Sequence, residues 1–323
     1  MKNIKTITGA IVVLFMSITA CRVLSQAKVY TFSLPILDEI AGSNLGIMLN
    51  DVVKVISEKT GIKSEVKKRT FTRGEQTLPI TRQSFEKDNT DFGLVFSEDY
   101  VRLIKENDRN PVIVPLAVLS MNGHKEMEIC FYVKKNSSYN KVGDLKGGKV
   151  GAATASSIRY LLHKEAGYDD SLFNFFSDVK FISDMNVSDL VKSTIAGEID
   201  TFAVNKYSYA IANKGPEAGQ LKTLACAPYV LNFIIAAHRG VDPVLTSKVK
   251  TLFLKAHKDE AFSRFKFLFT AIKGKFENIS KDDLKNTRAV MELLEKYNWE
   301  NDDVRIGKLK PKETPRKQLP RSD

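Results

Sequence analysis

Short apolar runs and stretches of helical periodicity alternate along most of this chain. In the first half, apolar runs bounded by polar turns predict buried strands at residues 29–33, 62–67, 91–96, 112–119 and 129–133. Apolar positions three or four apart predict a helix over about residues 45–60, which ends before Gly61. Strands that alternate with helices in this way indicate an α/β fold with a parallel or mixed sheet.

The second half of the chain repeats this alternation, and glycines mark the ends of its helices. The pattern predicts further strands at residues 149–152, 179–182, 199–204, 221–226 and 232–238. Helices are predicted over about 156–166 and 187–196, followed by Gly167 and Gly197, and the chain turns mainly helical after Pro243. Predicted helices in that last part span residues 244–257, 262–271 and 282–297. A chain of 323 residues with this pattern suggests two lobes.

The first twenty residues have the composition of a secretory signal. Lys2 and Lys5 precede an uncharged run over 7–20, which is shorter than the roughly 20 apolar residues that a membrane span needs. The run ends in Ile-Thr-Ala-Cys, which resembles a bacterial lipobox whose cysteine, here Cys21, is lipidated. Cleavage after Ala27 is the alternative. We therefore expect an exported protein, periplasmic or at the cell surface, with a signal peptide over 1–21.

Positive charge is concentrated at the two ends of the chain. Of the net charge of +11, residues 1–27 contribute +3 and residues 308–323 contribute +4, which leaves +4 for the body. We expect the basic tail over 301–323 to be disordered. Because no basic stripe is interleaved with aromatic residues, the sequence argues against nucleic-acid binding.

Sequence signatures of the common enzyme classes are missing from the chain. It contains no GxSxG, HExxH, P-loop or GxGxxG motif. Its histidines lack the spacing of metal ligands, so we expect neither a metal nor another cofactor; they are His124, His163, His238 and His257. After processing, Cys130 and Cys226 remain, and they could form a disulfide or stay as two buried thiols.

Several motifs resemble a known family. Residues 144–151 read Asp-Leu-Lys-Gly-Gly-Lys-Val-Gly and resemble an element of the substrate-binding proteins of ABC transporters, of the phosphate, phosphite and phosphonate type. Further segments resemble the same family in the same order: 91–97 with Tyr100, 155–162, 197–204, 227–238 and 240–243. The resemblance covers roughly residues 28–270.

This resemblance implies a two-lobed periplasmic-binding-protein fold of type II, an α/β fold in which two crossover strands form a hinge. The crossings are expected near residues 129–133 and 232–237. Lobe I would then comprise 28–128 plus 232–300, and lobe II would comprise 134–231. On this map Cys130 and Cys226 lie close to the two crossings, and a hinge disulfide between them is a hypothesis.

The resemblance also implies the function. We expect a monomeric solute-binding protein that closes on a small anionic ligand, delivers it to an ABC permease in the cytoplasmic membrane and catalyses nothing. Modification of Cys21 would add a lipid anchor. Two alternatives stay open: a sensory or scaffold lipoprotein without a transport role, and an enzyme on the same two-lobed scaffold.

The expected ligand-binding residues come from both lobes. A helix N-terminus after the strand at 149–152 would bind an anionic head, and the hydroxyls of Ser156 and Ser157 would add donors or merely cap the helix. Arg159 could hold the anion or point to solvent, and Asp200 could bind ligand or pair within its lobe. The full set is Ser33, Ser97, Tyr100, Thr154, Ser156, Ser157, Arg159, Asp200, Asn205 and Tyr207.

The chain departs from the family pattern at the helix that would hold the anion. Ala153 and Thr154 stand where family members usually have Asp-Pro, and Ile158 and Arg159 stand where a hydroxyl and a glycine are usual. The sequence therefore leaves the identity of the ligand open.

Overall fold

A computed structural model describes residues 28–37, 44–71, 77–106, 111–152, 154–181, 187–213, 217, 219–265, 269–270 and 273–299. The predicted signal peptide, Cys21 and the basic tail lie outside these residues. No helix in the described part of the chain is long and apolar enough to span a membrane.

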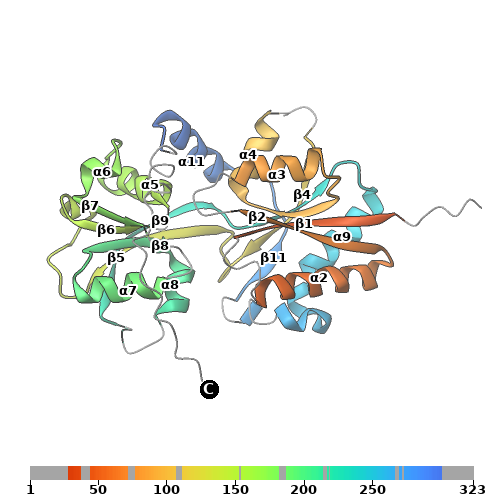
Figure 1. Cartoon of the computed structure of the whole chain (residues 1–323), viewed down its shortest axis with the longest axis horizontal. Helices are drawn as coiled ribbons and strands as arrows, with labels where there is room; N and C mark the ends of the chain where they lie inside the picture. Colours follow the sequence, from red (N-terminus) through yellow and green to blue (C-terminus); the bar gives the residue numbers. More distant parts are fainter. Residues whose placement is uncertain are drawn as a thin grey trace, which may run out of the picture.

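The first sheet has six strands in the order β11-β4-β10-β3-β1-β2 within the described residues. Their bounds are β1 Val29–Leu37, β2 Lys63–Phe71, β3 Phe92–Val95, β4 Ile113–Ser120, β10 Ile234–His238 and β11 Lys275–Glu277. Strands β1, β2 and β3 run parallel, whereas β10 is antiparallel to both of its neighbours. The longer helices among the described residues beside this sheet are α2 Asn44–Thr60, α3 Thr77–Glu86, α4 Ser97–Glu106 and α9 Pro243–Lys255. Helices α3 and α4 cover one face of the sheet, and α2 and α9 cover the other (Figure 1).

The second sheet has five strands in the order β7-β6-β8-β5-β9 within the described residues. Their bounds are β5 Glu126–Lys134, β6 Lys149–Ala152, β7 Asp178–Phe181, β8 Thr201–Asn205 and β9 Leu221–Leu231. Helices α5 Ala155–Ala166 and α6 Leu172–Phe175 lie on one face of it, and α7 Val187–Ala196 and α8 Lys206–Ala212 lie on the other (Figure 1). The expected α/β fold with two lobes is confirmed.

Some elements differ from those that the periodicity predicts. Helices α3, α4 and α8 and the short strand β11 were not predicted. The first part of the helix predicted over 262–271 is a kinked 3-10 segment, η5, over Glu260–Phe265. Residues 269–270 are helical, and the rest of the predicted helix lies outside the described residues.

The chain crosses between the sheets at two neighbouring places. It passes from β4 to β5 through residues 121–125, the first connection, and returns from β9 to β10 through Asn232 and Phe233, the second connection. Residues 129–133, where the sequence predicts the first crossing, lie inside β5, so the chain crosses a few residues earlier. The two connections are joined directly, because the backbone N and side-chain Nδ2 of Asn232 both donate to the carbonyl oxygen of Lys125, at 2.9 Å and 3.0 Å.

Helix α11 Lys285–Lys296 contacts both lobes, although the sequence assigns its residues to the first (Figure 1). On the second-lobe side, the backbone N of Leu231 in β9 donates to Thr287 Oγ1 at 3.0 Å, and Trp299, just after the helix, is fully buried. On the first-lobe side, Lys105 of α4 pairs with Glu295 at 3.0 Å. Helix α11 is therefore a further link between the two sheets.

Cys130 and Cys226 form a disulfide in the structure. They lie directly opposite each other in the antiparallel β5–β9 ladder, with their Cα atoms 4.1 Å apart. The hypothesis placed this bond at the hinge. The bond lies instead within the second sheet, because β5 already begins at Glu126 and β9 continues to Leu231.

We predict that neither Cys130 nor Cys226 reacts with an alkylating reagent when the unreduced protein is unfolded, and that both react after reduction. Peptide mass mapping checks this and separates these two cysteines from Cys21. The Cys130→Ser/Cys226→Ser double variant should lose about 2–4 kcal/mol of unfolding free energy, since the bond closes a long loop. Two reactive thiols without reductant would contradict the disulfide.

Candidate functional site

The carboxyl ends of the parallel strands of both sheets face the two connections. In the second sheet, Asn205 at the end of β8 lies opposite Ile129, near the start of β5, and β6 runs parallel to β8. In the first sheet, Val95 at the end of β3 lies opposite Ile234 at the start of β10. Ligands of α/β sheets bind outside the carboxyl ends of the strands, so the space beside the connections is the candidate site.

Helices α4 and α5 begin at these two facing edges, directly after β3 and β6. The first turn of a helix carries backbone N–H groups without intrahelical partners and the positive end of the helix dipole. An anion between the sheets could therefore be stabilised without a formal positive charge.

Three of the predicted hydroxyl residues lie together at the start of α5. Thr154 is the exposed N-cap residue, and its Oγ1 lies 2.7 Å from the Oγ of Ser157. Ser157 also donates to the carbonyl oxygen of Thr154 at 3.1 Å, so this pair shapes the first turn. Ser156 lies between them in sequence and is 9% exposed.

Ser97 and Glu98 form the start of α4. The hydroxyl of Ser97 donates to the carbonyl oxygen of Leu231 at 2.7 Å, which fastens α4 to the end of β9 across the two sheets. Glu98 comes next and is half-buried. Burial raises the pKa of its carboxyl to about 7, and the neighbouring Asp99 adds to this, while hydrogen bonds from its own backbone and from Ser97 oppose the shift.

Sequence reasoning missed Glu98, although the residue stands inside the motif that placed Ser97 and Tyr100 at the site. An acidic residue in the first turn of a helix has an ordinary role there, because it complements the dipole. The burial that raises its pKa is visible only in the structure.

Asn205 and Tyr207 lie at the carboxyl end of β8, beside the first connection. The side-chain oxygen of Asn205 accepts from the backbone N of Tyr207 at 2.8 Å and so caps α8. The hydroxyl of Tyr207 donates to the carbonyl oxygen of Met121 at 2.7 Å, which ties α8 to the first connection.

Arg159 and Asp200 have structural partners away from the two facing edges. Arg159 is buried, its Nη2 donates to the carbonyl oxygen of Asp169 at 2.7 Å, and its guanidinium lies 5.4 Å from the centre of the Trp299 ring. Asp200 precedes β8 and accepts from the hydroxyl of Tyr139 at 3.0 Å and from the backbone N of Lys149 at 2.7 Å.

Tyr100 and Ser33 are enclosed within the first lobe. Tyr100 is 4% exposed and packs in the core, and burial raises the pKa of its hydroxyl to about 12. Ser33 is also buried, and its hydroxyl donates to the Oγ of Ser84 at 3.3 Å. Six of the predicted residues therefore lie at the start of α4, the start of α5 or the end of β8: Ser97, Thr154, Ser156, Ser157, Asn205 and Tyr207. Thr154 and Asn205 are the more exposed of them, whereas Ser97 and Ser157 are buried. Ser33 and Tyr100 are enclosed in the first lobe, and Arg159 and Asp200 bond to partners elsewhere in the second.

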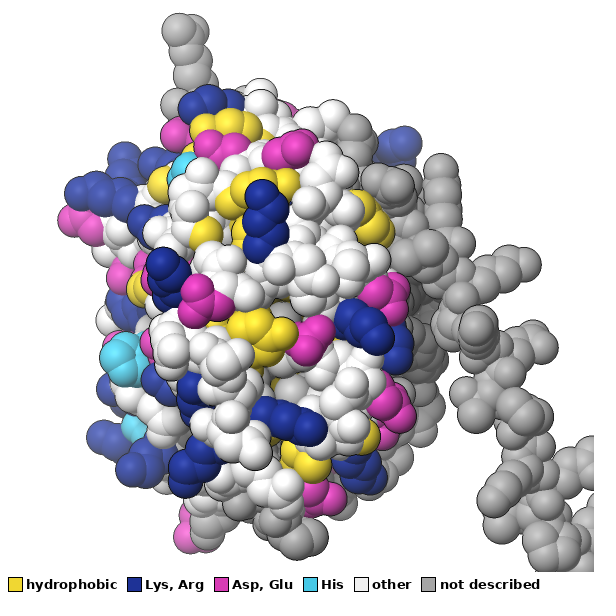
Figure 2. Space-filling view, turned by 90° about the vertical axis from the view of Figure 1, so that its left-hand side faces the viewer, with side chains coloured by type: hydrophobic (Ala, Val, Ile, Leu, Met, Phe, Trp, Pro, Cys, Tyr) yellow, Lys and Arg dark blue, Asp and Glu magenta, His cyan; other side chains and the backbone are white. Residues whose placement is uncertain are grey.

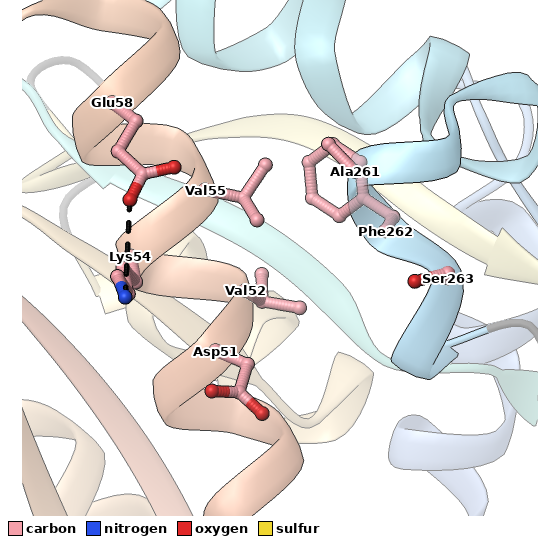
Figure 3. A pocket seen from close by; sticks show the side chains of 8 residues that line it. All are labelled: Asp51, Val52, Lys54, Val55, Glu58, Ala261, Phe262 and Ser263. Carbon is pink, nitrogen blue, oxygen red and sulfur yellow. Dashed lines mark ion pairs between the residues drawn. The ribbon is translucent and has the colours of Figure 1, made fainter.

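Two surface grooves elsewhere contain none of the predicted site residues. One lies between α2 and η5, where Val55 faces Phe262 and an ion pair joins Lys54 to Glu58 (Figure 3). The other is lined by Lys134, Lys135, Asn136, Ile195, Gly219 and Gln220 at the far end of the second sheet. The surface at that end of the molecule carries basic and acidic side chains interspersed (Figure 2).

A family model decides the family of this chain. The model for the periplasmic substrate-binding protein of phosphonate ABC transporters matches residues 49–284, well over half of the sequence. The chain belongs to this family. Proteins of this family are the periplasmic solute-binding components of ABC importers, as the sequence resemblance predicts.

Solved structures share the fold of this family member at low sequence identity. PhnD1 of Prochlorococcus marinus, in complex with methylphosphonate, is 17% identical with a TM-score of 0.61, over 85% of this chain and 100% of that chain. A binding protein component of an ABC phosphonate transporter from Pseudomonas aeruginosa is 13% identical with a TM-score of 0.58, over 87% and 94%. The periplasmic aliphatic sulphonate binding protein SsuA of Escherichia coli is 14% identical with a TM-score of 0.52, over 90% and 95%. No curated protein sequence matches the chain.

The raised pKa of Glu98 predicts a pH-dependent cost to stability. Below pH 4.5 the carboxyl is protonated in both the folded and the unfolded chain, so it has no effect. Between about pH 4.5 and 7 only the unfolded chain releases the proton, and stability falls as pH rises. Glu98→Gln should therefore be more stable than the parent protein at pH 8, by up to about 3 kcal/mol of unfolding free energy, and should unfold at a higher temperature there. At pH 4 the two proteins should unfold at the same temperature.

Thermal denaturation between pH 4 and 8 measures this effect. Glu292→Gln, at an exposed position on α11, is the matched control and should follow the parent protein. A stability difference between Glu98→Gln and the parent that is equal at pH 4 and pH 8 would show that burial does not raise this pKa.

Proposed function

We propose that this family member binds a small anionic ligand of the phosphonate, phosphite or phosphate kind between its two sheets and delivers it to an ABC permease. The observation that carries this proposal is that α4 and α5 begin at the two facing sheet edges. Their first turns can stabilise one oxyanion from both sides.

The bound ligand of one related structure and the names of two others support this ligand class. One related protein holds methylphosphonate, another is named for phosphonate and a third for aliphatic sulphonate. Phosphonates and sulphonates share a tetrahedral head of several oxygens bearing negative charge. Thr154, Ser156 and Ser157 are the residues of this chain that we assign to such a head.

We propose that the ligand acts by hinge closure. An anion that contacts both lobes favours the conformation in which both sets of contacts exist together. The two connections are the places where the chain can bend, and Asn232 holds them side by side. The lobes would be residues 28–128 plus 232–300 and residues 134–231, with α11 contacting both.

We propose that the protein is exported, and that Cys21 carries a lipid anchor if the lipobox is used. The protein would then act as a monomer at the outer face of the cytoplasmic membrane. It would release its ligand unchanged, without catalysis, so mass spectrometry of the ligand after incubation should find no product.

Ligand binding should raise the unfolding temperature. At a ligand concentration of 100 times Kd the stabilisation is about 2.7 kcal/mol. A thermal-shift screen with phosphate, phosphite, methylphosphonate and small carboxylates tests the ligand class, and we expect the oxyanions with a phosphorus centre to stabilise most. A screen in which none of these anions raises the unfolding temperature would contradict the proposal.

A variant at the start of α5 tests the position of the site. Ser156→Ala should weaken binding of the stabilising anion by at least about tenfold, because a hydrogen bond to a charged group contributes about 1.5–3 kcal/mol, which is roughly 10- to 150-fold in affinity. Ser177→Ala is the matched control, since Ser177 lies exposed next to the amino end of β7 and donates to the carbonyl oxygen of Gly148. Equal affinities of the two variants would place the anion elsewhere.

A further inference from the structure

Three phenylalanine rings form a continuous row along the edge of the first sheet that faces the second. Phe71 is the last residue of β2, Phe96 follows the last residue of β3, and Phe233 lies in the second connection. The ring centres of Phe71 and Phe96 are 5.9 Å apart in an edge-to-face contact, and those of Phe96 and Phe233 are 5.1 Å apart. We call these three rings the phenylalanine row.

The phenylalanine row stands apart from most of the hydrophobic core. Each of its side chains is partly exposed. Among the described residues, the three core clusters and the side chains packed against them include Phe233 but neither Phe71 nor Phe96. Apolar side chains gathered on a solvent-accessible surface often mark a binding surface.

The row lies beside the proposed anion site. Phe96 immediately precedes Ser97, where α4 begins, and Ser97 is hydrogen-bonded to Leu231, two residues before Phe233. This bond holds the start of α4, and with it Phe96, next to the second connection. The rings are therefore positioned before any ligand binds, which reduces the entropy lost on binding.

We propose that the phenylalanine row binds an apolar organic substituent on the anionic ligand. The row would then select among anions that share one head, favouring a larger alkyl or aryl substituent, such as that of propylphosphonate or phenylphosphonate, over a methyl group. Small-molecule sites combine an apolar lining with a few polar groups that fix orientation. Here the helix N-termini fix the charged head, and the row contacts the carbon substituent. This proposal rests on the proposed function, because it assumes that the head binds at those N-termini.

The test is a series of ligands with one head and increasing apolar size: methylphosphonate, propylphosphonate and phenylphosphonate, with inorganic phosphate as the head alone. Isothermal calorimetry on the full-length protein gives each Kd. Affinity should rise by up to about fourfold for each methylene group that the row covers, so propylphosphonate should bind about tenfold more tightly than methylphosphonate.

Substitution of the central ring locates the effect. Phe96→Ala should remove most of the gain from methyl- to propylphosphonate, while Phe96→Leu should retain part of the gain. Phe173→Ala is the matched control, because Phe173 is a partly buried phenylalanine of α6, which lies before β7 in the second lobe. It should leave the whole series unchanged.

The outcomes separate the two proposals. Binding of every phosphonate with no dependence on substituent size would overturn the role of the row and leave the anion site intact. A size dependence that persists in Phe96→Ala would also overturn it. No binding of any anion by the folded parent protein would reject the proposed function itself, and the role of the row with it.

Discussion

Strands β5 and β9 pair antiparallel, and each continues directly into one of the two connections between the sheets. Their ladder, with a disulfide inside it, fixes where the chain leaves the second sheet and where it returns. The hydrogen bonds from Asn232 to Lys125 then hold the first and second connections side by side. The carboxyl ends of the parallel strands of both sheets lie beside this point, since Val95 of β3 is opposite Ile234 and Asn205 of β8 is opposite Ile129.

That arrangement accounts for the electrostatics of the candidate site. The site gathers helix N-termini and hydroxyl groups, whereas Arg159 is held by Asp169 and Trp299 inside the second lobe. Glu98 lies at the same edge with a carboxyl whose pKa is raised by burial to about 7. A bound anion would raise that pKa further, since a second negative charge nearby favours the protonated form.

The sequence predicts the fold well because buried strands are short apolar runs, which local patterning reveals. It also places the start of α5 at the site, since Thr154, Ser156 and Ser157 follow a strand directly. It could not show that Trp299, 140 positions later, packs over Arg159, because nothing local records such a contact. The hydrogen bond between Asp200 and Tyr139 could not be predicted for the same reason, since the two residues are distant in sequence.

The phenylalanine row could not be predicted from the sequence either, because its residues are also distant from one another along the chain. Its members come from a strand end, a helix start and a connection, and no periodicity links these three positions.

Gly151 is a residue that the sequence does single out, as part of a family motif, but its role in the structure is in packing. A Cβ there would lie 2.3 Å from a terminal side-chain carbon of Leu190, so a larger residue would displace the Leu190 side chain of α7 that packs on β6.

The packing after α11 determines the environment of the protein's intrinsic fluorophore, Trp299. Trp299 is the single tryptophan of the chain, and it lies buried beneath the guanidinium of Arg159 and stacked on Tyr297. Indole emission responds to a nearby charge and to exclusion from water. All tryptophan fluorescence of this protein therefore originates where α11 meets the second lobe, and its emission wavelength and intensity report on that one junction.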